Sequence, residues 1–128
     1  QNLSLILTIL FSIIIFNSTS YAEWKQLSKN TNGTIFYVDI DVLKRKGNLI
    51  YFWQLSDFLT PQTNGVLSLK TYILLDCDTS GYKVLSWLWY KESMGNGNVF
   101  MSDHNPDKNW HFNTPGSSGD FIATKLCK

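Results

Sequence analysis

The two histidines of this 128-residue chain, His104 and His111, fall in one irregular stretch near its end. With Asp103 and Asp107 they could form a metal site, because imidazole and carboxylate groups are common zinc ligands. However, a His-x6-His spacing in a segment without periodicity matches no ligand pattern that has a structural basis. The spacing favours solvated loop residues, with a metal-binding or hydrolytic loop at 104–111 as the alternative.

Serine and cysteine nucleophiles have no supporting pattern either. Ser117 and Ser118 directly precede a segment of helical character, where a serine serves as an N-cap. Cys77 stands between Asp76 and Asp78, and a disulfide would remove its thiolate. No spacing singles out a pair of carboxylates for acid–base catalysis. We therefore expect no catalytic residue, no cofactor and no bound metal, and a protein that is not an enzyme.

The densest positive charge of the chain lies in Lys44, Arg45 and Lys46. Ahead of them, Asp39 can cap a short helical turn that Gly47 would end. Such a basic run is usually a solvated face, and it can also bind a polyanion or an acidic patch on another protein. We name these three basic residues as the candidate binding residues.

Aromatic residues recur along the predicted strands at spacings that place them on shared faces. The pairs are Tyr51 with Trp53, Trp87 with Trp89, and Tyr82 with Tyr90 on the side opposite to those two tryptophans. One short helix cannot cover both faces of such a sheet, so we expect one face to be free for a ligand or for self-association. A base-stacking platform for nucleic acid would also need a positive field, which the near-neutral charge does not supply.

Runs rich in β-branched and aromatic residues, bounded by turn-forming residues, position these side chains. They predict six strands, at 23–28, 34–38, 49–58, 66–77, 82–91 and 99–102. In the run 66–77 the odd positions up to Cys77 are mostly apolar, whereas the even positions are more polar. This alternation predicts that one face is core and that Cys77 points into it.

A short helix is predicted over 121–126, with Ser117 as N-cap and Asp120 as its capping partner. Docking this helix on the sheet would bring Cys127 towards Cys77. An even number of cysteines in an exported chain favours a disulfide. The predicted fold class is therefore α+β: a single, mainly antiparallel sheet of about six strands, with a short C-terminal helix packed on it and one disulfide.

The first 22 residues predict a secretory signal peptide. Leu3 to Phe16 is a nearly unbroken apolar run, which as a helix would span about 21 Å and fall short of the ~30 Å bilayer core. Ser20 and Ala22 supply the small residues of a cleavage site. The sequence begins without Met, so we expect the start of the leader to be missing. No cysteine follows the apolar run, so a lipoprotein anchor is not expected.

The remaining residues, 23–128, suffice for one domain and are too few for two. They hold all eleven basic and all ten acidic side chains, so no global field favours nucleic acid or an anionic membrane. We expect an exported protein, periplasmic or at the cell surface, without a stable membrane span after cleavage.

The order of landmarks along 23–128 resembles the surface-adhesin protein E family of small exported bacterial proteins. The carriers are Trp24, Phe36-Tyr37-Val-Asp39 with the later Gly47, Trp53-Gln-Leu, Asp76-Cys77, Gly95-Asn-Gly97, Trp110 ahead of Pro115-Gly-Ser117, and Cys127. The resemblance implies an antiparallel sheet carrying a C-terminal helix, a Cys77–Cys127 disulfide and a capacity to form homodimers. Because the family includes an adhesin for host matrix and serum proteins, it also implies a protein ligand, either a host matrix protein or an envelope component.

These observations together predict a non-enzymatic, exported bacterial binding protein that is adhesin-like and acts through protein–protein contact. The alternative is a small periplasmic enzyme or metal-binding protein that uses the loop from His104 to His111.

Overall fold

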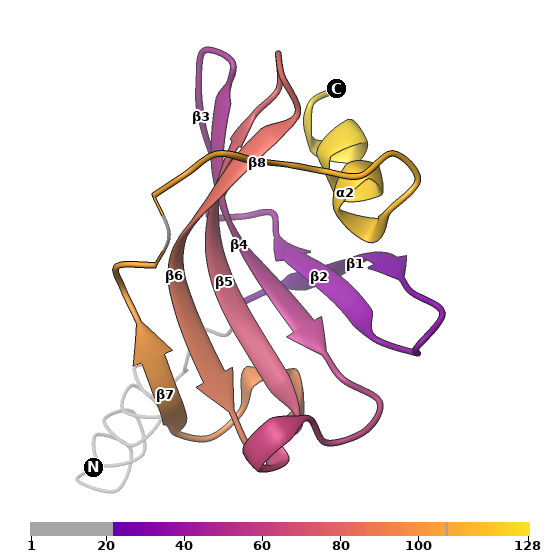
Figure 1. Ribbon diagram of the computed structural model, residues 1–128, viewed down its shortest axis with the longest axis vertical. Coiled ribbons are helices and arrows are strands. Elements are labelled where there is room, and N and C mark those ends of the chain that lie inside the picture. Colours follow the sequence, from indigo (N-terminus) through magenta and orange to yellow (C-terminus); the bar gives the residue numbers. More distant parts are fainter. Residues whose placement is uncertain (1–21, 107) are drawn as a thin grey trace, which may run out of the picture.

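The computed structural model describes residues 22–106 and 108–128, so the predicted signal peptide lies almost wholly outside the described part of the chain. These residues form one sheet of eight strands with one α-helix near the C-terminus (Figure 1). The strands are β1 (Trp24–Lys29), β2 (Ile35–Asp39), β3 (Lys44–Lys46), β4 (Leu49–Asp57), β5 (Ser68–Asp76), β6 (Gly81–Tyr90), β7 (Val99–Asp103) and β8 (His111–Phe112). The helices are α2 (Ser118–Leu126) and two 3-10 turns, η1 (Thr63–Gly65) and η2 (Ser93–Gly95). No helix in the described residues is long and apolar enough to cross a membrane.

The sheet is an antiparallel meander in the order β1-β2-β4-β5-β6-β7. The two short strands complete its edges, since β3 pairs with the first residues of β4 and β8 pairs with the first residues of β6. The long central strands pair residue by residue, from Leu49 opposite Asp76 to Asp57 opposite Ser68. The predicted α+β fold with an antiparallel sheet and a C-terminal helix is confirmed, with two short strands more than expected.

The alternation predicted for the middle strand decides which face holds the core. Thr71, Ile73 and Leu75 of β5 are buried on the face that α2 covers, which we call the helix face. Ile50 and Phe52 of β4 lie beside them in the core. The helix contributes three buried residues, Ile122, Ala123 and Leu126. Cys77 packs against this core, as the alternation predicts.

The helix is held at both ends. Ser117 is its N-cap, and the Ser117 Oγ accepts a hydrogen bond from the Asp120 amide, as the sequence predicts. At the other end Cys127 forms the predicted disulfide with Cys77, 50 residues earlier. Arg45 of β3 also reaches this end, where its guanidinium donates to the Leu126 carbonyl at 2.7 Å.

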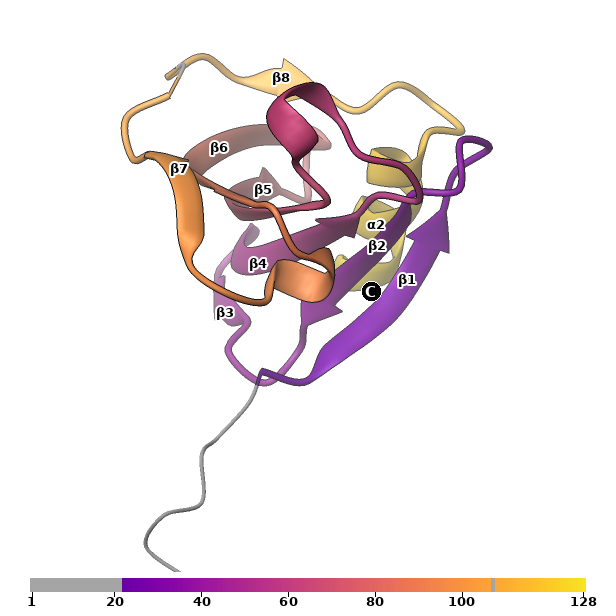
Figure 2. The same ribbon diagram turned by 90° about the horizontal axis from the view of Figure 1, so that it is seen from below.

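The other side of the sheet, which we call the outer face, is covered only in part. Figure 2 shows α2 on one side of the sheet and the connection between β6 and β7, which contains η2, on the other. The Ser68 hydroxyl ties this connection down, because it donates to the Glu92 carbonyl at 2.6 Å and accepts from the Gly95 amide at 2.8 Å. The Met94 amide donates to Asp57 in the same region. The connection therefore buries the end of the outer face near Ser68.

Two local predictions are wrong. The turn predicted ahead of Lys44 is present, since the Asp39 carboxylate accepts from the Asp41 amide and the Leu43 amide donates to the Ile40 carbonyl. Gly47 does not end it, because Lys44 to Lys46 form β3, half of a hairpin with β4 that turns at Gly47 with a φ of 59°. Tyr82 does not lie opposite Trp87, because a bulge at Leu85 reverses the alternation within β6 and places both residues on the helix face. Local patterns favoured the wrong answers because a hairpin and a bulge both depend on the neighbouring strand.

Candidate functional site

An aromatic cluster lies on the outer face, at the end that the β6–β7 connection leaves uncovered. Tyr72 of β5 is its centre, with ring centroids 5.0 Å from Trp53 and 6.3 Å from Tyr51, both on β4. All three side chains are partly exposed. The strand register makes this contact, because Trp53 stands directly opposite Tyr72 and Tyr51 is the next outer-face residue along β4. We call these three residues the aromatic patch.

Three lysines share the outer face with the aromatic patch. Lys44 stands opposite Tyr51 in the β3–β4 hairpin, and Lys46 stands opposite Leu49, so both point to the outer face. Lys83 of β6 joins them from the other side. Of the three predicted binding residues, the structure therefore brings Lys44 and Lys46 to the patch. Arg45 alternates to the helix face and binds the end of α2, which is a structural contact.

A second pair of rings extends the outer face beyond β6. The Trp110 ring lies 4.7 Å from the Lys83 Nζ, and Phe112 of β8 is 65% exposed. Both rings pack against Gly81, where an added Cβ would come within 3.2 Å of Phe112 and 3.4 Å of Trp110. The sequence does not predict this contact, because Trp110 lies in a segment with no periodic pattern. Gly81 was the available signal, since a side chain there would make a tight contact with the Phe112 ring.

The histidines contact different faces of β6. His104 Nδ1 is 2.7 Å from the Oγ of Ser86, which points to the outer face. The His111 ring lies 5.8 Å from the Tyr82 ring on the helix face. Within the described residues no group of three potential ligands could hold a metal ion, and Asp107 lies outside that part of the chain. The two rings therefore do not converge on one site.

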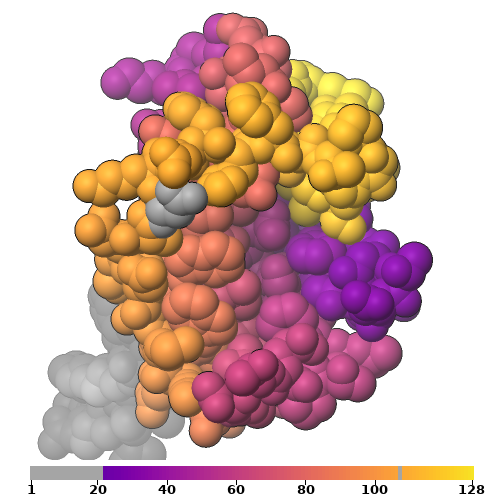
Figure 3. All heavy atoms as spheres, in the orientation of Figure 1, coloured from indigo at the N-terminus to yellow at the C-terminus, as the bar shows by residue number. Residues whose placement is uncertain are grey.

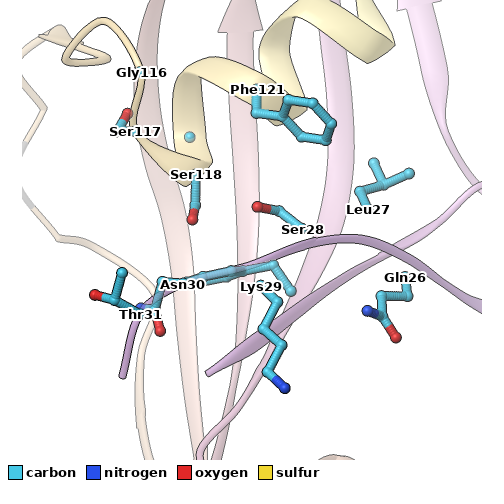
Figure 4. Close-up of a pocket in the computed structure, with 12 residues that line it drawn as sticks. Gln26, Leu27, Ser28, Lys29, Asn30, Thr31, Gly116, Ser117, Ser118 and Phe121 are labelled. Carbon is cyan, nitrogen blue, oxygen red and sulfur yellow. The ribbon is translucent and has the colours of Figure 1, made fainter. Parts of the chain in front are cut away.

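A wide cleft lies between β1 and the start of α2, with a volume of about 1020 Å³. Figure 4 shows the Ser28 and Ser118 side chains in the space between the strand and the helix, whereas Lys29 points away from it. The Ser117 hydroxyl at its edge is already bound as the helix cap. The cleft offers scattered hydroxyls without a charged group aimed into it, so the aromatic patch remains the better candidate.

Two side chains near the covered end of the outer face have pKa values that differ from their ordinary values. Burial lowers the pKa of Lys70, because the charged ammonium loses water there. Its Nζ lies 4.9 Å from the Tyr90 ring and 5.7 Å from the Trp24 ring, so aromatic faces replace part of that water. Burial also raises the pKa of Tyr90. These contacts fill the space beneath η2, where the Lys70 side chain lies next to Gly95.

Comparison with known proteins gives one consistent answer. The family model for surface-adhesin protein E matches residues 24–128. A crystal structure of Haemophilus influenzae protein E superposes with a TM-score of 0.60 at 18% identity, covering 85% of this chain and 90% of that chain. A structure of protein E from non-typeable Haemophilus influenzae gives 0.56 at 17% identity, covering 86% and 78%. These structures are similar in fold, and no curated protein sequence matched.

Proposed function

Because the chain belongs to the surface-adhesin protein E family, we propose that it is an exported, adhesin-like binding protein without enzymatic activity. It works in the periplasm or at the cell surface, after removal of residues 1–22. Its partner is a protein, either a host matrix protein or an envelope component. The contact is made by the aromatic patch and the lysines around it.

The observation that carries this proposal is the aromatic patch itself. Its three rings, Tyr51, Tyr72 and Trp53, are partly exposed on the face of the sheet that α2 does not cover. Tyrosine and tryptophan are enriched where proteins bind one another, because they bury a large area and keep a polar group at the rim. Such rings often account for most of the binding energy at the centre of an interface.

The charges around the patch indicate the kind of protein that fits. Lys44 and Lys46 lie on the strand beside Tyr51, and Lys83 lies on β6 with its ammonium against the Trp110 ring. Asp76 at the hairpin end is the acidic outer-face neighbour of this region. A partner with an acidic rim around an apolar centre would meet complementary charge here. A second copy of this chain would bring its own lysines to the contact, so the charges favour a different protein over a homodimer at this patch.

The alternative function, a metal-dependent or hydrolytic loop, receives no support from a specific contact. Ser86 and His104 form a hydrogen-bonded pair, yet within the described residues no carboxylate orients the other nitrogen of the His104 ring. We do not propose it.

Binding to immobilised matrix proteins and to an envelope extract tests the proposal. The binding variant replaces only two of the three basic residues, Lys44→Ser and Lys46→Ser. Arg45 is kept because it contacts the end of α2, so its loss would disturb the fold as well as the binding surface. We expect this double variant to slow association and weaken binding by about threefold to tenfold, with a smaller effect at high salt. Tyr72→Ser should weaken the same binding further, because it removes the central ring.

The matched control is Lys25→Ser with Lys128→Ser, which removes the same charge from the side of the molecule that carries α2. This control should bind like the unchanged protein. Unchanged binding by both the lysine variant and Tyr72→Ser would remove the aromatic patch from the proposal.

A further inference from the structure

The helix face holds a pocket of about 270 Å³ beside α2. Ile122 and Ala123 of the helix form one wall, Phe52 and Thr71 lie on the sheet beneath, and Trp87 lies at the β6 side. Figure 3 shows this face recessed between the helix in yellow, the β1–β2 pair in indigo and β6 in salmon. The pocket therefore lies beside the N-terminal part of α2, where the sheet extends beyond the start of the helix.

Thr71 gives this pocket a polar group with no partner. Its side chain is 4% exposed, and its Oγ1 forms no hydrogen bond within the described residues. A buried hydroxyl without a partner is unfavourable, and native proteins usually satisfy such groups. Gln54 stands directly opposite Thr71 on β4 and lines the same pocket, as does Ser56. Donors and acceptors are therefore grouped on one part of a mainly apolar wall, to which Asn113 adds a further amide.

We propose that this pocket binds a small, neutral, largely apolar molecule that carries one hydrogen-bonding group, which pairs with the Thr71 hydroxyl. The apolar part packs on Phe52, Trp87 and the helix residues, and the polar group reaches the floor between Thr71 and Gln54. No lining residue is charged at neutral pH, so the pocket has nothing to balance a charged ligand.

The volume of about 270 Å³ suits a small ligand of about one or two rings, since a cavity of roughly 150 Å³ already holds benzene. Specific pockets combine an apolar lining with a few placed polar groups, and this one has that composition. A single water could pair with the polar groups, but it would leave most of the 270 Å³ and the apolar part of the wall unfilled. This pocket lies on the opposite side of the sheet from the aromatic patch. Ligand binding in the pocket is therefore independent of the protein–protein contact proposed above.

Titration of the purified, isotope-labelled protein by NMR, with 4-methylphenol and toluene as probes, tests the proposal. The probes differ by one hydroxyl group, so their comparison isolates the hydrogen bond to Thr71. We expect 4-methylphenol to shift the amide signals of Thr71 and Gln54 and the Trp87 indole signal. Its binding should be about fivefold to tenfold tighter than that of toluene.

Two variants make the test specific. Thr71→Val keeps the shape of the side chain and removes its hydroxyl, so it should bind 4-methylphenol no better than toluene while toluene binding is unchanged. Thr60→Val, on an exposed loop, is the control and should still bind 4-methylphenol more tightly than toluene. The spectra also show whether each variant is folded.

The proposal is overturned if neither probe shifts signals from the pocket, or if the shifts occur elsewhere on the surface. It is also overturned if Thr71→Val keeps the full preference for 4-methylphenol, because the hydroxyl of Thr71 would then not recognise the ligand.

Discussion

Replacing both Cys77 and Cys127 by serine removes the covalent link between α2 and the β5–β6 hairpin. The residues are 50 positions apart, and in the chain-entropy model a loop of that length stabilises the fold by about 4 kcal/mol. For a domain of this size that corresponds to a fall in melting temperature of about 15 °C or more. In the variant α2 should unfold before the sheet does, because a helix of nine residues is too short to persist without packing.

Urea unfolding followed by circular dichroism measures this free energy, and hydrogen exchange shows whether α2 opens before the sheet. The unchanged protein should lose the same stability in reducing agent, and the serine variant should be indifferent to it. A serine variant within about 1 kcal/mol of the unchanged protein would refute the reasoning. In that case the buried side chains of α2 alone would hold the helix.

Arg45→Gln removes the hydrogen bond to the Leu126 carbonyl and a positive charge at the helix C-terminus, so we expect a loss of about 1 kcal/mol in urea unfolding. Lys44→Gln, one residue away on the outer face, is its control and should leave stability unchanged. Burial lowers the pKa of Lys70, so the native state releases this proton at a lower pH than the unfolded chain does. The unchanged protein should therefore gain stability relative to Lys70→Met as the pH rises towards 10.5, the ordinary pKa of lysine, measured by thermal melting; parallel curves would contradict this.

The sequence predicted the elements whose pattern is local. The apolar alternation along β5 identified the helix face and the direction of Cys77, because burial on one side of a sheet imposes a period of two. The cap at Ser117 was predictable for a similar reason, since its hydroxyl bonds an amide three residues later. Both signals are contained within a few residues.

Features that depend on a neighbouring strand were not predictable in this way. The bulge at Leu85 moves Tyr82 to the helix face, and only its pairing with β5 shows the shift. Lys44 to Lys46 have no strand pattern of their own and become β3 by pairing with β4. The aromatic patch likewise needs the register that sets Trp53 opposite Tyr72.

The lengths of the elements explain why both faces of the sheet keep exposed or half-open regions. Nine residues of α2 extend about 14 Å, whereas ten residues of β6 extend about 33 Å, so the helix cannot cover the length of the sheet. The disulfide decides which part is covered, because Cys77 follows the end of β5 and Cys127 follows the end of α2. The C-terminal end of α2 is therefore fixed near Cys77, and the pocket beside Thr71 lies near the other end of the helix. Since the β6–β7 connection covers the same far end of the outer face, the aromatic patch is left open on the other side, near the disulfide end.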